Sequence, residues 1–524
     1  MQATLDRALL AESNKQWLES LALCRSAQAI SSDHPDVLNL LGRLVGLGGD
    51  AARAIALQRV VLRQRPDHLR AAEDLRIALV AVRSPEEAHK AYRGAIELEP
   101  DIQCHHRHPG SLEPFAGIDQ VEAALLGASA WDPSHALAQA ALGNVHARRG
   151  RYASALDAYS LAVMLDPNLR AVHLALAELL ELLHEPSAAR HRETALAAQR
   201  MYLADEVSEK AVQSVLVLMA PGDFSNMNAP LDFLVNHNRI ALHRCYLLPG
   251  GPFDSAKLPD YDSIFNAIDE NEASQATIEM AVQIIASQSK PALNRPQHLG
   301  KTARSALRET LSEVRACVVP VTKRLAQDAL KSIPAGAMSI EGIAFPLLIR
   351  PVNTHGGRGL ERLAAAHEIP SYLERLHAGY FNVAEFVDNR NADGYYRKYR
   401  VVVVDGKPLP YHLAISPDWM VHYISSPMEE HAWMREEEER FLADPRCIFP
   451  DWDRIFGEMA AAIGLDYFGV DCTLLPDGRI FVFEAGPAML VHCRESLEMF
   501  AYKYRYVPRI FDVFEEMLAK RKLN

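Results

Sequence analysis

The sequence has few positive charges for its length. It contains 55 Lys and Arg against 67 Asp and Glu, which gives a formal net charge of −12 over 524 residues. Proteins that bind nucleic acids or anionic membranes need clustered Lys and Arg. We therefore expect no general binding to nucleic acid or to membranes. A local basic pocket for a phosphate remains compatible with this composition.

Cysteine pairs and long apolar runs are also lacking. The seven cysteines include no C-x-x-C pair, and their number is odd. This pattern favours reduced thiols over a disulfide framework. No stretch approaches the ~20 apolar residues that a membrane helix requires, and the charged amphipathic start of the sequence does not resemble a signal peptide. These absences predict a cytoplasmic protein.

The first part of the chain contains an internal repeat. Small and apolar residues recur at a spacing of about 34 residues. Small residues allow two antiparallel helices to approach closely, larger ones fill the gap to the next repeat, and proline ends each second helix. The pattern resembles the tetratricopeptide repeat. Its best copy carries Leu142, Gly143, His146, Ala155, Tyr159, Ala162 and Pro167.

This resemblance implies an all-α superhelix over residues 1–205 with a concave groove. Such a groove would bind a peptide or a partner protein, although a scaffold without a ligand remains an alternative. The run Cys104-His105-His106 in this part is interpreted as an irregular exposed loop, because no distant metal ligands accompany it.

The pattern changes near residue 213. Short apolar runs at 214–220, 241–248 and 261–268 precede a helical pattern at 278–285, and this alternation predicts a parallel, doubly wound layer. The charged run Glu436–Arg440 is expected to be a solvated helix face. Further strands are expected at 345–351, 381–387, 399–406, 468–475 and 479–485.

A glycine-rich turn follows one of the later strands. Arg350 ends that strand, and Gly356, Gly357 and Gly359 follow within a few residues. Glycines allow backbone N–H groups to close around phosphate oxygens. The turn is therefore a candidate phosphate site, with an ordinary flexible loop as the alternative.

Two further strands carry candidate ATP contacts. Glu385, Phe386 and Val387 end a strand that could offer backbone groups to adenine between apolar walls, although a plain edge strand is the alternative. Lys398 and Arg400 share one strand face, because side chains alternate with a period of two. Like charges on one face are destabilising unless an anion lies there. We interpret the pair as a triphosphate or acyl-phosphate contact, with a solvated sheet face as the alternative.

Two carboxylates occupy the arms of a predicted hairpin. Asp471 and Glu484 lie in apolar strands joined by Pro476-Asp477-Gly478, a strong turn signal that places them almost opposite each other. Buried carboxylates are costly unless they are paired or bound to a metal. A shared magnesium ion is the interpretation that we favour, and a buried ion pair with arginine is the alternative.

In their order along the chain, these motifs resemble the ATP-grasp superfamily, which includes glutathione synthetase and D-alanine–D-alanine ligase. The resemblance implies a Rossmann-like subdomain at 213–297 and an α/β ATP-grasp fold at 298–524. Within the latter it implies a central lid subdomain at about 305–385 and a C-terminal subdomain at about 386–524. ATP and Mg²⁺ would be the cofactors.

The resemblance also assigns roles to single residues. Arg304, Arg350 and Lys398 would bind the phosphates. Arg400, aided by Arg350 and Lys398, would be catalytic at the acyl phosphate. The adenine hinge would be formed by Glu385, Phe386 and Val387, and the magnesium ligands would be Asp471 and Glu484.

Two positions depart from the family pattern. Arg350 stands where a lysine is usual, which keeps the charge but not the geometry. Gly486 stands where an asparagine two residues after the glutamate usually binds the metal. If that loss limits turnover, Gly486→Asn should raise activity. His412, His422 and His492 flank the proposed site as candidate substrate contacts, with a structural role as the alternative for each.

The predicted reaction is ATP-dependent ligation of a carboxylate to an amine through an acyl phosphate, with release of ADP. The repeats would recruit a peptide or protein that carries one substrate, which raises its effective concentration. The alternatives are a nucleotide-binding scaffold or adaptor without turnover, and an ATP-dependent kinase. The sequence names neither the substrates nor the partner.

Overall fold

The computed structural model describes most of the chain, and its contacts divide it into two compact units, Met1–His191 and Arg192–Asn524. The Cys104-His105-His106 run lies outside the described residues. No described helix is both long and apolar enough to cross a bilayer. The described residues are 2–30, 34–81, 85–99, 102, 117–183, 185, 187–198, 200–202, 212–222, 227–250, 253, 257–271, 274–352, 354, 356–423 and 425–521.

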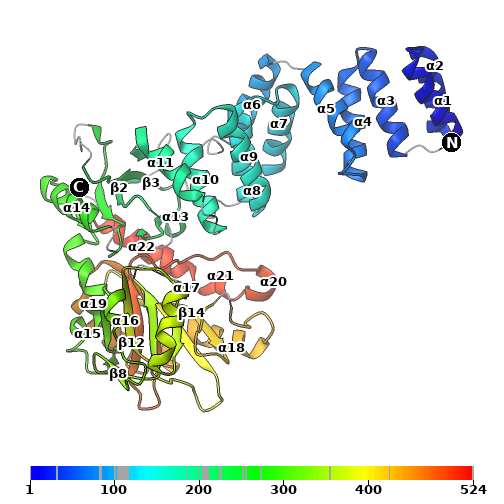
Figure 1. The fold of residues 1–524 in the computed structure, drawn as a ribbon. Coiled ribbons are helices and arrows are strands. Elements are labelled where there is room, and N and C mark those ends of the chain that lie inside the picture. The colour runs from blue at the N-terminus through cyan, green and yellow to red at the C-terminus, as the bar shows by residue number, and fades with distance from the viewer. Residues whose placement is uncertain are drawn as a thin grey trace. The chain divides into compact units, whose positions relative to one another are not determined.

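The secondary structure of the first unit is helical in its described parts, coloured blue through cyan to blue-green in Figure 1. Most consecutive helices pack against each other, most extensively α8 against α9. This confirms the predicted all-α repeat unit. The helices are α1 (Gln2–Ser13), α2 (Trp17–Ile30), α3 (Pro35–Leu47), α4 (Ala51–Gln64), α5 (Leu69–Ala81), α6 (Pro85–Leu98), α7 (Ile118–Trp131), α8 (Ala136–Arg148), α9 (Tyr152–Leu165), α10 (Arg170–Leu182) and α11 (Ala188–Ala198).

The contact between α8 and α9 explains the glycine of the repeat. The ring of Tyr159 lies so close to Gly143 that a Cβ atom there would come within 2.4 Å of a ring carbon. The buried Tyr159 hydroxyl donates a hydrogen bond to Asn144 Oδ1 at 2.5 Å. Only a residue without a side chain allows the two helices to pack at this distance.

The second unit begins with a sheet of order β1-β3-β2-β4-β5. Strands β2 to β5 pair in parallel, and β1 is an antiparallel edge strand. The parallel layer that the sequence predicts is therefore confirmed. Its elements are β1 (Met201–Tyr202), β2 (Gln213–Met219), α13 (Leu231–Leu234), β3 (Ile240–Tyr246), β4 (Ser263–Asn266), α14 (Gln275–Ser287) and β5 (Ala292–Leu293).

A second, antiparallel sheet has the order β11-β10-β12-β7. Leu347, Ile349, Phe381 and Val383 of this sheet share one buried cluster with Tyr372 of α17. The elements are β7 (Thr322–Ala326), α16 (Gln327–Lys331), β8 (Ser339–Ile340), β9 (Ile343–Ala344), β10 (Leu347–Pro351), β11 (Glu361–Leu363), η6 (Ala366–Glu368), α17 (Ile369–Arg375) and β12 (Tyr380–Glu385).

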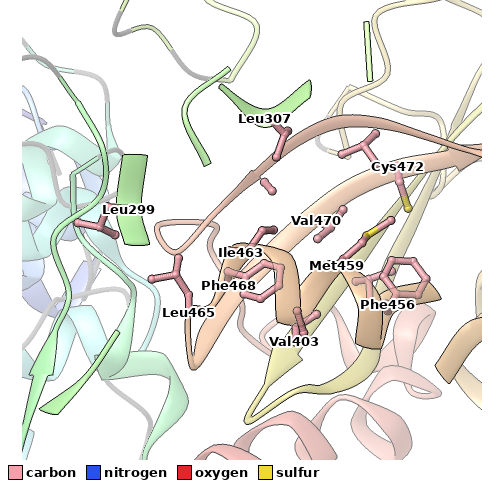
Figure 2. Packing of buried hydrophobic residues seen from close by; sticks show 14 of the residues in the cluster. Leu299, Leu307, Val403, Phe456, Met459, Ile463, Leu465, Phe468, Val470 and Cys472 are labelled. Atoms are coloured by element: carbon pink, nitrogen blue, oxygen red, sulfur yellow. The ribbon is translucent and has the colours of Figure 1, made fainter. Parts of the chain in front are cut away.

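The third sheet has the order β14-β13-β15-β16-β6, and its last pair is parallel. Phe468, Val470 and Cys472 alternate along β15 and join the buried cluster of α19, as Figure 2 shows. The residues between them, including Asp471, point to the other face. The elements are η5 (Pro296–Thr302), α15 (Leu307–Thr310), β6 (Cys317–Val318), β13 (Tyr396–Val404), β14 (Lys407–Ser416), α18 (Ala432–Ala443), η7 (Pro445–Cys447), α19 (Trp452–Ile463), β15 (Tyr467–Leu474), β16 (Ile480–Gly486), α20 (Leu497–Phe500), α21 (Lys503–Tyr506) and α22 (Pro508–Lys520).

Asn294 ties the first sheet to the third. Its side-chain amide donates to the Tyr467 carbonyl at 2.8 Å and accepts from the Tyr467 N–H at 2.7 Å. Its own N–H donates to Asp466 Oδ2 at 2.7 Å. Because Asn294 is completely buried, separating the two sheets here would leave buried polar groups unpaired.

Candidate active site

A row of polar side chains crosses four strands of the third sheet. Residues directly opposite each other on antiparallel strands project to the same face. Arg400 on β13 pairs with His412 on β14 and with Asp471 on β15, and Asp471 pairs with Glu484 on β16. The hairpin turn predicts that the two carboxylates lie almost opposite each other, and a register shift between Asp471 and Cys472 makes them direct partners. The row occupies the face away from α19.

Asp471 forms a buried ion pair with Arg400. The Arg400 Nε and Nη2 atoms donate to Asp471 Oδ1 and Oδ2 at 2.6 and 2.9 Å, and Lys398 Nζ lies 3.3 Å from Oδ2. The Asp471 side chain is only 1% exposed. Burial alone would raise its pKa, but Arg400 and Lys398 outweigh burial and hold the pKa well below its usual range. The ion pair that the sequence left as an alternative is thus present.

Glu484 occupies a more open position and pairs with Arg304. The two side chains are 31% and 22% exposed. Burial raises the pKa of Glu484, whereas the Arg304 guanidinium lowers it, and the net result is a pKa of about 2. Glu484 is therefore ionised at neutral pH. Because its pair is partly solvated, it can exchange partners at less cost than Asp471.

The glycine-rich turn lies near the 420–422 segment. Gly356, Gly357 and Gly359 all have positive φ angles, of 60°, 75° and 65°. A Cβ atom on Gly356 would lie 3.6 Å from His422 Nε2. At Gly359 it would lie 2.8 Å from Pro351 Cδ, so no other residue fits there without movement. The structure thus brings His422 to the predicted phosphate turn.

Arg350 is held by this turn. Its Nε donates to Thr354 Oγ1 at 3.1 Å, and its Nη2 donates to the Thr354 carbonyl. Burial, with the positive charge of Arg304 as the next cause, lowers the pKa of Arg350 to about 10. A second cation close by is unfavourable unless an anion joins them. The pair is therefore suited to hold a phosphate.

The predicted adenine hinge is only partly available. The Glu385 N–H donates to the Val321 carbonyl at 3.0 Å, so it cannot serve an adenine without breaking that bond. The Phe386 ring meets the edge of Trp419 at 5.9 Å, and the Arg362 guanidinium lies 4.9 Å from its centroid. The hinge prediction then depends on the remaining backbone groups of Glu385, Phe386 and Val387.

The other histidines differ in their surroundings. His412 is 6% exposed, stacks on Tyr423 at 4.7 Å, and its Nε2 has no hydrogen-bond partner among the described residues. Burial and then Arg400 lower its pKa well below the usual value, which keeps the ring neutral. The backbone N–H of His492 donates a hydrogen bond to the Tyr411 hydroxyl at 2.9 Å.

A buried charge cluster that the sequence did not reveal lies beside β14. Lys503 Nζ is completely buried and lies 2.7 Å from Glu495 Oε1 and 3.3 Å from Glu438 Oε1. Tyr502 and Tyr423 donate to Glu438 Oε2 at 2.5 and 3.1 Å. The prediction of a solvated helix face is therefore wrong for Glu438, because this position of α18 points into the core.

Asp269 is a second residue that no sequence motif marks. It follows β4 in the first sheet and is 8% exposed. Burial raises its pKa to about 7. Its carboxylate lies beside Gly486, where a Cβ atom would be 3.5 Å from Oδ2. A polar residue just beyond a parallel strand is a signal of a site, but one acidic residue alone is a weak signal.

The carboxylates suit magnesium only together with a nucleotide. Within the described ranges, no three His, Cys, Asp or Glu side chains are grouped as a metal site built from protein alone would require. Magnesium commonly uses one or two carboxylates and completes its shell with phosphates and water. Glu484 fits that donor set, whereas Asp471 would have to share its two oxygens with Arg400 to join it.

Comparisons with known proteins match the two parts separately, and no curated protein matches the chain. The family model of the tetratricopeptide repeat matches residues 136–169, which contain α8 and α9. A thermophilic TPR protein of Thermus thermophilus is 21% identical over 37% of this chain and 90% of its own, with a TM-score of 0.15. The D-Ala:D-Ser ligase VanG of Enterococcus faecalis is 13% identical over 58% of this chain and 99% of its own, with a TM-score of 0.36. A RimK domain ATP-grasp protein of Sphaerobacter thermophilus is 15% identical over the same 58% and 99%, with a TM-score of 0.33. The chain is therefore similar in part to tetratricopeptide proteins and in part to ATP-grasp ligases.

Proposed function

We propose that the second unit is an ATP-dependent ligase that joins a carboxylate to an amine through an acyl phosphate, with ADP as a product. The observation that carries this proposal is the polar row on one face of the third sheet. It combines carboxylates for a metal–nucleotide complex with cations for phosphates and is flanked by a glycine turn. The row and its flanking cations are His412, Arg400, Asp471, Glu484, Lys398, Arg304 and Arg350.

In this proposal the cations have different tasks. Arg304 exchanges its pair with Glu484 for a phosphate oxygen, which leaves Glu484 available to the metal. Arg350 holds the phosphates from the glycine turn. Lys398 has only one ion pair among the described residues, with Asp471, so its ammonium can also reach an anionic substrate. A bound magnesium ion would neutralise charge on the phosphates.

The chemistry proceeds in two steps. An oxygen of the substrate carboxylate attacks the γ-phosphorus and ADP leaves. The amine nitrogen then attacks the acyl carbon, the carbon–oxygen bond to phosphate breaks, and the amine loses a proton. Arg400 and Lys398 stabilise the negative charge that builds up in both steps. Arg400 is held rigidly by Asp471 and the Leu490 carbonyl, so it acts as a fixed charge that needs no reorganisation.

The helical repeats have a separate role in the proposal. Tetratricopeptide-like stacks expose an extended surface that suits a peptide or a protein segment. We propose that they recruit the partner that carries one substrate, which raises its concentration at the ligase.

Mass spectrometry of the full chain with ATP, Mg²⁺ and a panel of amino acids and peptides tests the function. Ligation predicts the formation of ADP together with a product whose mass equals that of the two substrates minus one water. A product of any greater mass would contradict ligation. The matched variant Glu484→Gln should lose product formation. Bound ATP without ADP would favour a scaffold, and a phosphorylated product that forms without an amine would favour a kinase.

A further inference from the structure

Position 486 lacks a side chain, but the space above it is occupied. Glu484 and Gly486 are two residues apart on β16 and face the same side of the sheet. A Cβ atom built on Gly486 would lie 3.5 Å from Asp269 Oδ2 and 3.6 Å from Oδ1. Both oxygens of a carboxylate from the first sheet therefore lie where a side chain at 486 would extend.

Asp269 is fixed in this position by its backbone. Its N–H donates to the Met227 carbonyl at 2.8 Å, and its carbonyl accepts from Ser274 Oγ at 2.8 Å. Asp269 Oδ1 accepts from the Glu270 N–H at 2.8 Å. Among the described residues, Oδ2 accepts no hydrogen bond. This oxygen is therefore available to a further ligand.

The charges around this oxygen indicate what the ligand is. Glu484 shares the same face, and its present partner is Arg304. When phosphates attract Arg304, two carboxylate side chains are left facing one space, and this arrangement favours the binding of a cation. Oxygen ligands from carboxylates, together with phosphate oxygens and water, are the donors that Mg²⁺ and Mn²⁺ prefer.

We propose that Asp269 replaces the missing side chain at position 486 and, with Glu484, holds the divalent cation of the metal–nucleotide complex. This inference rests on the proposed function, because it needs the nucleotide at the row. It also changes the expectation for Gly486→Asn. The new side chain would meet Asp269 in the same space, so this substitution alone should not improve metal binding.

Binding of Mn²⁺ to the full chain in the presence of ADP, followed by electron paramagnetic resonance of free Mn²⁺, tests the inference without requiring turnover. Asp269→Ala should weaken Mn²⁺ binding about tenfold or more, as loss of a supporting oxygen at a metal site does. Glu270→Gln is the matched control, because it removes a neighbouring charge and leaves the Asp269 carboxylate in place. It should change the affinity less than twofold on the same scale.

A relocation variant guards against misfolding. Asp269→Ala combined with Gly486→Asp returns a carboxylate to the same space from the other strand and should recover most of the Mn²⁺ affinity. Equal losses in Asp269→Ala and Glu270→Gln would overturn the inference, because they would show only a general field effect. If the wild-type protein binds Mn²⁺ in the presence of ADP and Asp269→Ala binds it with the same affinity, this inference alone is overturned. Wild-type protein that binds no Mn²⁺ with ADP overturns the proposed function as well.

Discussion

Replacing Arg400 by methionine should destabilise the third sheet strongly. The substitution keeps much of the side-chain volume but removes both hydrogen bonds to Asp471, whose side chain is 1% exposed. Breaking a buried ion pair by removing one partner costs about 3–5 kcal/mol, because it leaves an uncompensated charge. Lys398 stays 3.3 Å from Asp471 Oδ2, so we expect the lower end, about 3 kcal/mol.

Arg304→Met is the matched comparison on the same face. Its partner Glu484 is 31% exposed, so water can replace the guanidinium, and the cost should stay below about 1 kcal/mol. Both variants should lose affinity for ATP, because both remove a cation from the row. Arg304→Met should therefore lose nucleotide affinity with little loss of stability, whereas Arg400→Met should lose both.

The thiol of Cys472 offers a local assay. It is completely buried on β15, next to Asp471, and maleimide labelling of its peptide in urea, read by mass spectrometry, reports opening of this strand. A loss of about 3 kcal/mol corresponds to a roughly hundredfold larger opening constant at pH 7. Adding Asp471→Asn to Arg400→Met should recover much of the loss, because the unpaired charge is gone.

The stability that the Arg400–Asp471 ion pair contributes should decrease as the pH falls. The folded-state pKa of Asp471 is lowered, so its ion pair contributes stability that is complete above the unfolded pKa of about 3.9 and is lost as the pH falls below it. Without Arg400 the pKa of Asp471 rises. The gap in urea midpoint between wild type and Arg400→Met should therefore narrow from pH 7 to pH 3. A gap that is equal for Arg304→Met and Arg400→Met, or that widens in acid, would refute the reasoning.

Two further predictions concern packing and buried charge. Gly143→Ala should destabilise the α8–α9 pair by about 1–3 kcal/mol through overlap with the Tyr159 ring, whereas Gly127→Ala, with no atom within 4 Å, should stabilise α7 by about 0.5–1 kcal/mol. Hydrogen exchange of the two regions in the full chain measures both, and equal effects would contradict the packing argument. Lys503→Met should cost about 3–5 kcal/mol in urea unfolding, because Glu438 is left buried without its cation. Adding Glu438→Gln should recover part of that loss, and no recovery would show that the charge is not its cause.

The parts of the site that are close in sequence could be predicted from it. A turn of three residues at 476–478 sets the register of β15 and β16 near the turn and brings Asp471 within one residue of Glu484, and a register shift between Asp471 and Cys472, which the turn does not predict, places the two opposite each other. The spacing of Lys398 and Arg400 follows from the same period. The repeat period of the first part likewise gives its helical pairs, because Gly143 and Tyr159 recur in register.

The parts of the site that depend on contacts between distant segments could not be predicted from the sequence. No local pattern shows that Arg400 would take both oxygens of Asp471, since the pairing of β13 with β15 joins segments 71 residues apart. Asp269 reaches Gly486 only through the packing of the first sheet on the third. Glu438 looks solvated within a run of four glutamates, yet a helix turns one of them inward.

The Asn294 contacts have a consequence for substrate access. Three hydrogen bonds, two of them fully buried, fix the spacing between the end of β5 and the start of β15, the strand that pairs with the strand of Glu484. A hinge motion between the first and third sheets at Asn294 would have to break all three hydrogen bonds together. Entry of a nucleotide should therefore require displacement of the second sheet, which carries Arg350 and the glycine turn. The first and third sheets, which carry Asp269 and Glu484, should keep their positions relative to each other.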